Sequence, residues 1–250
     1  MKLLVPLTPD PRAPLARAHP LAKLGGAAAL FLALFLAIDP LTPAIVLAVL
    51  LAALPASGLG PGALATRAAP LALAAASIGL FNALFGDGGV AGGVAIGLRL
   101  AAIALAGLLS LATIDPTDLA DALVEHLHAP PRFAIGTLAA LRLLPIFSRE
   151  WETIGLARRA RGIDESSLGD RLRGFAERTL ALLVGAIRRA TRLATAMDAR
   201  GFDSGLPRTI ARPRAMTLGD GGWLAAAVAL ALGASGLSVA AGRWQFLLGQ

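Results

Sequence analysis

The chain has 250 residues, of which 56% are hydrophobic and 16% charged, with a mean hydropathy of +0.70 and a formal net charge of +7. Soluble domains average roughly 25% charged residues, so this composition excludes an ordinary soluble enzyme and a disordered chain. The absence of cysteine excludes disulfides, a thiolate nucleophile and cysteine-ligated metal centres. The class that remains is an all-α, polytopic membrane protein, and we predict no metal, catalytic or cofactor site in it.

Apolar runs separated by short Pro- and Gly-rich turns predict the membrane-spanning helices. A helix perpendicular to the bilayer needs about 20 residues to cross ~30 Å of hydrocarbon. The last two runs reach that length, whereas the second and third are short. The runs predict four N-terminal transmembrane helices within 21–113 and one C-terminal transmembrane helix at 223–241; they lie at 21–38, 44–55, 70–85, 94–113 and 223–241.

The positions of the basic residues predict how these helices are oriented. Lys2, Arg12 and Arg17 precede the first run and Lys23 lies at its start, while sixteen of the 23 Lys and Arg residues lie between positions 132 and 214. The predicted turns at 39–43 and 86–93 contain neither, while the predicted loop at 55–69 contains Arg67. Because basic residues accumulate on the cytoplasmic side, we predict that an N-terminal segment (1–20) and residues 114–214 are cytoplasmic.

The fourth run contains one charged residue, Arg99. We interpret it as lying near enough to the outer end of its helix for the side chain to reach the headgroups. Gly93, Gly97 and Ala101 recur every four residues in this region, a spacing that suits close helix packing.

Residues 114–214 predict three helices. Asp115-Pro116 is typical of a helix start, with Asp as the N-cap and Pro at the first helical position. A second helix is expected from about Arg132 to Arg161, bent near Pro145, with its apolar half at 133–147 lying at the membrane interface.

The third helix is expected from about Leu172 to Arg200 and is amphipathic. Its arginines at 178, 188, 189 and 192 fall away from the apolar stripe. A basic amphipathic helix is typical of a membrane-surface or partner-binding element. The stripe comprises Leu172, Phe175, Thr179, Leu183, Ala186, Ala190, Leu193 and Met197.

The second and third helices end in the same short motif. Ala160-Arg161-Gly162 is followed by Ile-Asp, and Ala199-Arg200-Gly201 by Phe-Asp, with the two arginines 39 residues apart. Glycine supplies the left-handed residue that terminates a helix, and a basic residue complements the negative end of the helix dipole. The motif therefore predicts an arginine held at each of two rigid helix ends.

With four N-terminal spans, two Ala-Arg-Gly motifs and a final span, the sequence resembles the T component of energy-coupling factor (ECF) transporters, the CbiQ/EcfT family. The opening His19-Pro20-Leu21-Ala22-Lys23-Leu24 and the segment 113–124 also resemble that family. The resemblance covers roughly residues 15–245. It implies a membrane subunit of an importer for vitamins or transition-metal ions, in which 114–214 is the coupling domain.

The resemblance also implies partners. The motif arginines of the family dock in grooves of two cytoplasmic ABC ATPase subunits, so Arg161 is expected to engage one and Arg200 the other. ATP is then bound and hydrolysed by the partners, in agreement with the absence of a phosphate-binding loop around either lysine of this chain. A membrane-embedded S component that binds the substrate is expected to contact the apolar stripe, namely Leu172, Phe175, Leu183, Ala186, Ala190, Leu193 and Met197, and the 133–147 segment.

Three alternative functions agree less well with the sequence. An intramembrane enzyme is disfavoured because Asp39, Asp87 and Asp115 fall at the ends of predicted spans. A nucleic-acid-binding membrane protein would use the basic segment but leaves the apolar stripe without a role, so we expect no nucleic-acid partner. A conventional ABC permease would contain its own substrate path and would transport without an S component.

Overall fold

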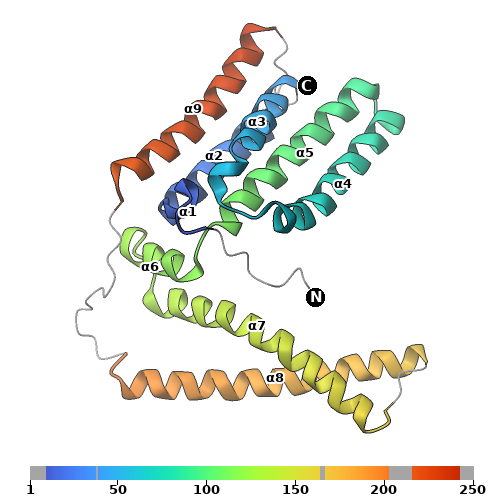
Figure 1. Cartoon of the computed structure of the whole chain (residues 1–250), viewed down its shortest axis with the longest axis vertical. Helices are drawn as coiled ribbons and strands as arrows, with labels where there is room; N and C mark the ends of the chain where they lie inside the picture. The colour runs from blue at the N-terminus through green and yellow to red at the C-terminus, as the bar shows by residue number, and fades with distance from the viewer. Residues whose placement is uncertain (1–9, 38, 164–166, 203–215, 243–250) are drawn as a thin grey trace. The chain divides into compact units, whose positions relative to one another are not determined.

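The computed structural model describes residues 10–37, 39–163, 167–202 and 216–242, and within these ranges the chain is helical without β-strands, as Figure 1 shows. The predicted all-α fold is therefore confirmed. The described residues divide into two compact units. We call the unit formed by 1–134 and 214–250 the bundle unit and that formed by 135–213 the crossing unit. The helices are α1 (Pro14–Arg17), α2 (Pro20–Leu36), α3 (Leu41–Ala52), the 3-10 helix η2 (Leu54–Ser57), α4 (Pro61–Phe85), α5 (Gly89–Ala112), α6 (Pro116–His126), α7 (Pro131–Ala160), α8 (Leu168–Ala199) and α9 (Leu218–Ala240).

Three helices of the bundle unit, α4, α5 and α9, are long and apolar enough to cross a bilayer, with 25, 24 and 23 residues. They correspond to the third, fourth and fifth predicted spans. The other two predicted spans form shorter apolar helices, because α2 ends after 17 residues and α3 after 12. A multi-pass membrane protein is thus confirmed, although α3 is much shorter than the hydrocarbon is thick.

The start of α4 corrects one prediction. The segment 55–69 was expected to be a loop, but α4 begins at Pro61, so Arg67 lies within a helix and Pro70 inside it. Gly60 is the N-cap and Pro61 opens the first turn, which is where proline is best tolerated. The alanines and the leucine around Arg67 have high helix propensity and favour α4. The charge of Arg67 lowers the hydropathy of this segment but does not interrupt the helix.

Helices α4 and α5 form a tightly packed antiparallel pair around glycines. A Cβ atom built on Gly93 would lie 2.5 Å from the Ala83 Cβ and from the Gly79 carbonyl oxygen. A Cβ on Gly79 would lie 2.9 Å from the Gly93 carbonyl oxygen. Small residues let the two backbones approach this closely, as the predicted spacing at Gly93 and Gly97 indicates.

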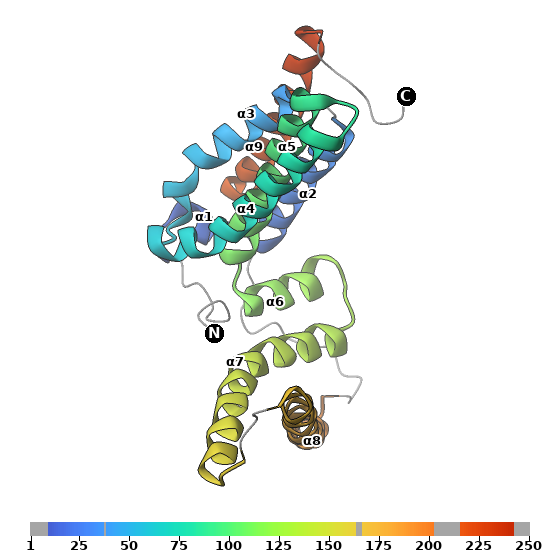
Figure 2. The ribbon, with the colours of Figure 1, turned by 90° about the vertical axis from the view of Figure 1, so that its right-hand side faces the viewer.

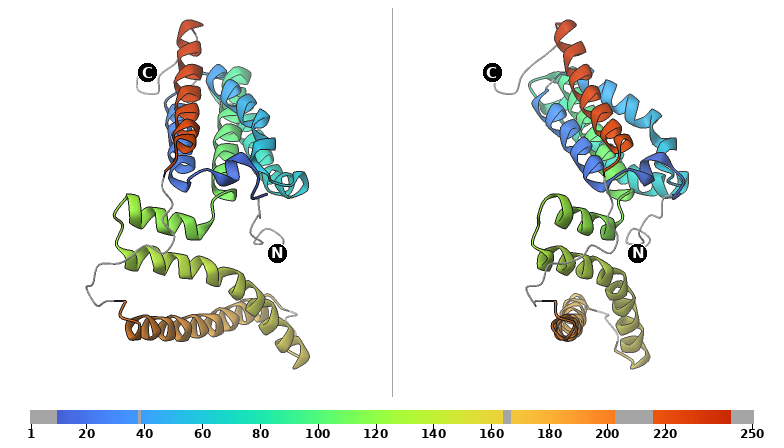
Figure 3. Two further views of the ribbon diagram at one scale, coloured as in Figure 1. Left: turned by 60° about the vertical axis from the view of Figure 1, so that its left-hand side comes forward. Right: turned by 90° about the vertical axis from the view of Figure 1, so that its left-hand side faces the viewer.

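The core of the bundle unit lies between α2, α3, α5 and α9. Figure 3 shows α9 running beside α2, which are distant in sequence. The buried side chains that meet there are mostly small or aliphatic, so the contact depends on shape rather than on polar pairing. They are Leu30, Leu34, Val46, Ala102, Ala106, Ala231 and Ala234.

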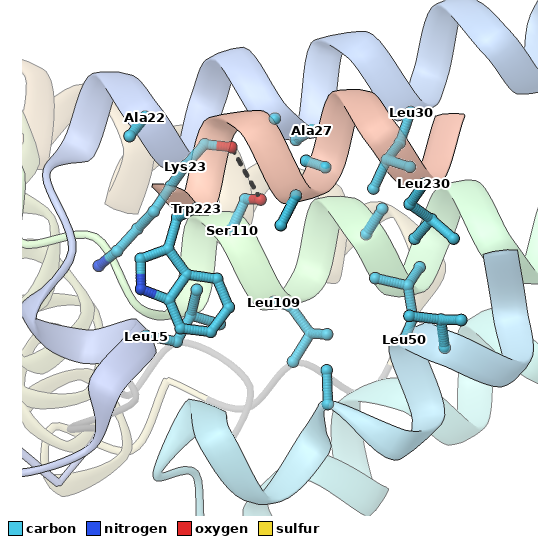
Figure 4. A pocket seen from close by; sticks show the side chains of 16 residues that line it. Leu15, Ala22, Lys23, Ala27, Leu30, Leu50, Leu109, Ser110, Trp223 and Leu230 are labelled. Carbon is cyan, nitrogen blue, oxygen red and sulfur yellow. Dashed lines mark hydrogen bonds between the residues drawn. The ribbon is translucent and has the colours of Figure 1, made fainter. Parts of the chain in front are cut away.

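A cavity of about 180 Å³ lies between the same four helices, with Leu15 of α1 at its edge (Figure 4). Its lining is aliphatic except for Lys23, Ser110 and the Trp223 indole. The Lys23 ammonium donates hydrogen bonds to the carbonyls of Ala16 and Thr113. The cavity therefore suits an apolar occupant better than a polar one.

The Arg99 guanidinium interacts with groups inside the protein. Its guanidinium donates a hydrogen bond to the carbonyl of Ala37, the C-cap of α2. The buried Asp39 carboxylate interacts electrostatically with the same guanidinium and also accepts hydrogen bonds from the backbone NH and hydroxyl of Thr42. The expected route to the headgroups is thus replaced by contacts with the α2–α3 turn, which neutralise the charge locally.

Candidate functional site

The crossing unit contains α8 and all but the first turn of α7, and both helices start and end near their predicted limits. Helix α7 remains continuous through Pro145, and Figure 2 shows that it bends partway along its length. Helix α8 begins at Leu168, one turn before the predicted Leu172. The extra turn is fixed by a capping box in which Ser167 and Asp170 exchange side chain to backbone hydrogen bonds, and this Ser-x-x-Asp signal is present in the sequence.

Two ion pairs connect α7 to α8 where the helices cross (Figure 1). Arg189 donates two hydrogen bonds to the Glu150 carboxylate, one of them 2.9 Å long from Nη1 to Oε2. Arg158 donates to Glu177, which also accepts from Arg173 at 3.2 Å. Paired arginine–carboxylate bonds fix geometry as well as distance, so these pairs define the crossing.

Aromatic rings also take part in contacts between α7 and α8. The rings of Trp151 and Phe175 meet edge to face with centroids 5.3 Å apart. The Arg178 guanidinium lies 5.7 Å from the Trp151 centroid, and the Arg189 guanidinium lies 5.5 Å from the Phe147 centroid. Both arginines were predicted only to point away from the apolar stripe. The structure brings them against α7, where cation–π contacts add to the ion pairs.

Acid is expected to loosen this crossing. The hydrogen bond from Arg158 lowers the pKa of Glu177. A carboxylate with a lowered pKa stabilises the folded contact above its usual pKa of about 4.3, and this contribution is lost as the pH falls through the lower folded value. In a chain that keeps Trp151 as its only tryptophan, acrylamide quenching should therefore rise as the pH falls below about 4. The matched Glu177→Gln chain should be quenched more at neutral pH and change less with pH. Identical pH profiles for the two chains would contradict this prediction.

The two Ala-Arg-Gly motifs form the same helix end twice. In α7 the NH of Gly162 donates to the Arg159 carbonyl at 3.0 Å and the NH of Ile163 to the Arg158 carbonyl at 3.2 Å. In α8 the corresponding bonds, from Gly201 to Asp198 and from Phe202 to Met197, are 2.9 and 3.0 Å.

Gly162 and Gly201 have φ angles of +73° and +74°. This is the Schellman geometry, which needs a left-handed residue after the last helical turn. The predicted role of the two glycines is confirmed, and each end holds an arginine at its C-cap.

Arg161 and Arg200 are both exposed. Among the described residues, neither guanidinium forms an ion pair. Because the segment after α7 leads into the start of α8, the two arginines lie toward opposite ends of α8, whose 32 residues make a rod about 48 Å long. The aspartates that complete the repeated sequence, at 164 and 203, lie outside the described residues. The site is thus a pair of separate, similarly shaped cationic helix ends.

The apolar stripe of α8 is largely uncovered within the crossing unit. The Leu172 and Leu183 side chains are 65% and 54% exposed, and Leu193 is 43% exposed. Ala190 is exposed, whereas Ala186 and Met197 are half-buried. Phe175 belongs both to the stripe and to the contact with Trp151. Its assignment as a partner surface stays a prediction.

Within the described ranges, no cluster of three or more His, Asp or Glu side chains is placed to bind a metal ion. The fold and these helix ends define an all-helical, multi-pass membrane protein with a separate unit of two crossing amphipathic helices. The family model described as "Cobalt transport protein" (CbiQ) matches residues 11–209. The chain therefore belongs to the CbiQ family of transporter membrane proteins.

Curated relatives agree with this assignment. The chain is 37% identical over 154 residues to the energy-coupling factor transporter transmembrane protein EcfT of Exiguobacterium sibiricum, covering 54% of this chain and 58% of the relative. It is 30% identical over 141 residues to EcfT of Bacillus subtilis, covering 53% and 52%. Matches to these relatives thus span only about half of their length. A putative ABC transporter ATP-binding protein of Bifidobacterium longum is 27% identical over 218 residues, covering 77% of this chain and 28% of that relative.

Proposed function

We propose that the chain is the coupling subunit of an ECF-type importer, which transmits the conformational change of ATPase partners to a substrate-binding S component in the membrane. The observation that carries the proposal is the pair of exposed arginines, Arg161 and Arg200, each presented by the same helix-end geometry. The substrate is expected to be a vitamin or a transition-metal ion bound by the S component, and this chain is expected to be non-catalytic.

The chemistry of the helix ends favours acidic grooves as their docking sites. A guanidinium forms bidentate, charge-assisted hydrogen bonds with carboxylates. Two such groups toward opposite ends of a rod about 48 Å long suit two separate ATPase subunits better than one. The similarity of this chain to part of a relative named as an ATP-binding protein also favours an ATPase partner.

Because α7 and α8 are held together where they cross, a movement of one arginine-bearing helix end is expected to move the other helix as well. The ion pairs and ring contacts link Glu150 and Trp151 of α7 to α8. A displacement of either arginine would therefore move both helices together. The exposed leucines of the α8 stripe are the proposed surface through which this movement reaches the S component.

A conventional permease is the weaker proposal. The cavity in the bundle unit is lined by aliphatic groups, and the Lys23 ammonium beside it is bonded to two carbonyls. A polar vitamin or a metal ion would lose its hydration there without equivalent partners.

Cross-linking from the two helix ends tests the proposal. The chain contains no cysteine, so Arg161→Cys and Arg200→Cys each introduce a unique attachment point for a cysteine-directed photo-cross-linker. Each is expected to capture a co-expressed ATPase subunit, because both ends dock. Asp87→Cys in the α4–α5 turn is the control and should capture none. If neither helix end yields an adduct while the complex is intact, the proposal is wrong.

The proposal also requires the N-terminal segment and the crossing unit to face the cytoplasm. Asp87 in the α4–α5 turn and Thr195 on α8 are both exposed. A membrane-impermeant maleimide should therefore label Asp87→Cys in intact cells but Thr195→Cys only after permeabilisation. Labelling of Thr195→Cys in intact cells would exclude cytoplasmic ATPase partners for α8.

A further inference from the structure

Ionisable side chains are buried together at one end of the bundle unit. His19 is fully buried, and Lys23 and Asp220 are 6% and 7% exposed. We call these residues, with Thr113 and His126, the α2 junction. Buried charged groups are costly unless they are well paired, so their shared position calls for a structural explanation.

Lys23 attaches the first turn of α2 to the end of α5. Its ammonium donates a 2.8 Å hydrogen bond to the carbonyl of Thr113, the C-cap of α5, and a 3.1 Å bond to the carbonyl of Ala16 in α1. Thr113 is itself 3% exposed. The end of α5 is therefore fixed to α2.

His19 attaches the same turn to α6 and to α9. Its backbone NH donates a 2.6 Å hydrogen bond to Oδ1 of Asp220, while Oδ2 of that carboxylate accepts from the Thr217 hydroxyl at 2.7 Å in the capping box of α9. The His19 ring meets the His126 ring edge to face, with centroids 4.9 Å apart. Its Nδ1 accepts the Leu21 NH and caps α2.

The α2 junction joins elements that lie on both sides of the crossing unit in the order of the chain. Within the bundle unit, α5 and α6 precede the crossing unit at 135–213 in the chain, and α9 follows it. The elements before the crossing unit, at Thr113 and His126, and the one after it, at Asp220, are all held by residues 19–23 at the start of α2.

We infer that the α2 junction is the connection through which movement of the crossing unit reaches the membrane helices α2 and α9, with His19 and His126 as positioning residues. A shift of α6 changes the His19–His126 ring contact, and a shift of Thr217, the N-cap of α9, acts on the Asp220 carboxylate that holds His19. Each displacement is thereby converted into movement of the first turn of α2, because the buried hydrogen bonds resist being broken. The inference rests on the proposed function and names the residues through which the movement passes within the chain.

The test uses the full chain co-purified with its ATPase subunits. Leu32 of α2 is 58% exposed, so Leu32→Cys can carry an environment-sensitive fluorophore, and the signal is the emission change on adding a non-hydrolysable ATP analogue with Mg²⁺. His126→Leu removes one ring of the pair. His19→Asn removes the other ring but keeps a side-chain acceptor that can cap α2. His128→Asn is the control, because His128 is exposed, has φ +52°, and asparagine tolerates that conformation.

Both ring variants are expected to reduce the nucleotide-dependent signal at least about fivefold, the lower end of typical coupling between sites. ATPase recovery should remain at the level of His128→Asn. The double variant should lose no more than either single variant, because both act on one contact. If His126→Leu fails to assemble, His19→Asn decides the outcome. A signal equal to the control overturns the inference alone, whereas failure of the unmodified chain to bind ATPases overturns the proposed function and the inference with it.

Discussion

Reversing both helix-end charges, with Arg161→Glu and Arg200→Glu together, is expected to abolish recovery of ATPase subunits with the affinity-tagged chain. In the proposed complex, each substitution removes a guanidinium from an acidic groove and places a carboxylate there instead. Losing one buried charge pair costs about 2–5 kcal/mol. Two losses at the lower limit already weaken binding by about a thousandfold. The measurement is the ratio of ATPase to tagged chain after purification from membranes.

The matched control is Arg159→Glu with Arg188→Glu. These residues are exposed, lie on the same two helices and undergo the same change of charge, but neither is held at a helix C-cap. The control should recover ATPases nearly as well as the unmodified chain. Equal loss from both double variants would mean that general basicity, rather than the positions of Arg161 and Arg200, supports binding. Membrane insertion should be unaffected in either case, since all four positions lie outside the apolar helices.

Replacing Gly93 by alanine is expected to have the largest effect on the fold itself. The new Cβ would lie 2.5 Å from the Ala83 backbone nitrogen and from the Gly79 carbonyl oxygen. Backbone atoms of two packed helices cannot rotate away, so α4 and α5 must separate. Overpacking typically costs about 1–3 kcal/mol and sometimes more, and we expect a value near the upper limit. The measurement is the thermal unfolding midpoint of the purified chain in detergent.

The neighbouring Gly92 provides a control of opposite sign. A Cβ on Gly92 meets nothing within 4 Å, and alanine is favoured over glycine inside a helix by up to about 1 kcal/mol. Gly92→Ala should therefore leave the unfolding midpoint unchanged or raise it. If Gly93→Ala were as stable as Gly92→Ala, the close α4–α5 contact would not exist in the protein.

Local sequence patterns predicted correctly those helix starts and ends that depend on a few neighbouring residues. Asp115 caps α6 as expected, and Gly162 and Gly201 terminate their helices in the predicted conformation. The start of α4 was missed because Arg67 and Pro70 both looked like interruptions. A charged residue lowers the mean hydropathy of a segment but does not prevent it from being helical. A proline inside a helix is tolerated when neighbouring contacts compensate for the lost hydrogen bond.

The parts of the site that could not be predicted are those set by tertiary geometry. Glu150 and Arg189 are 39 residues apart, and they pair only because α7 and α8 cross at one angle. His19 and Asp220 are 201 residues apart, and no periodicity in the sequence relates them. The helix ends are different, since each Ala-Arg-Gly motif contains all the groups that its geometry needs.

The brevity of α3 has a consequence for the surrounding lipid. Its 12 residues make a helix about 18 Å long, beside neighbours of 23–25 residues that match the ~30 Å hydrocarbon layer. Lipids on that flank have to compress or tilt their acyl chains to cover it. We therefore expect the bilayer beside α3 to be locally thinned, and the elastic cost of that thinning to make lipid chain length a determinant of how readily the helices rearrange.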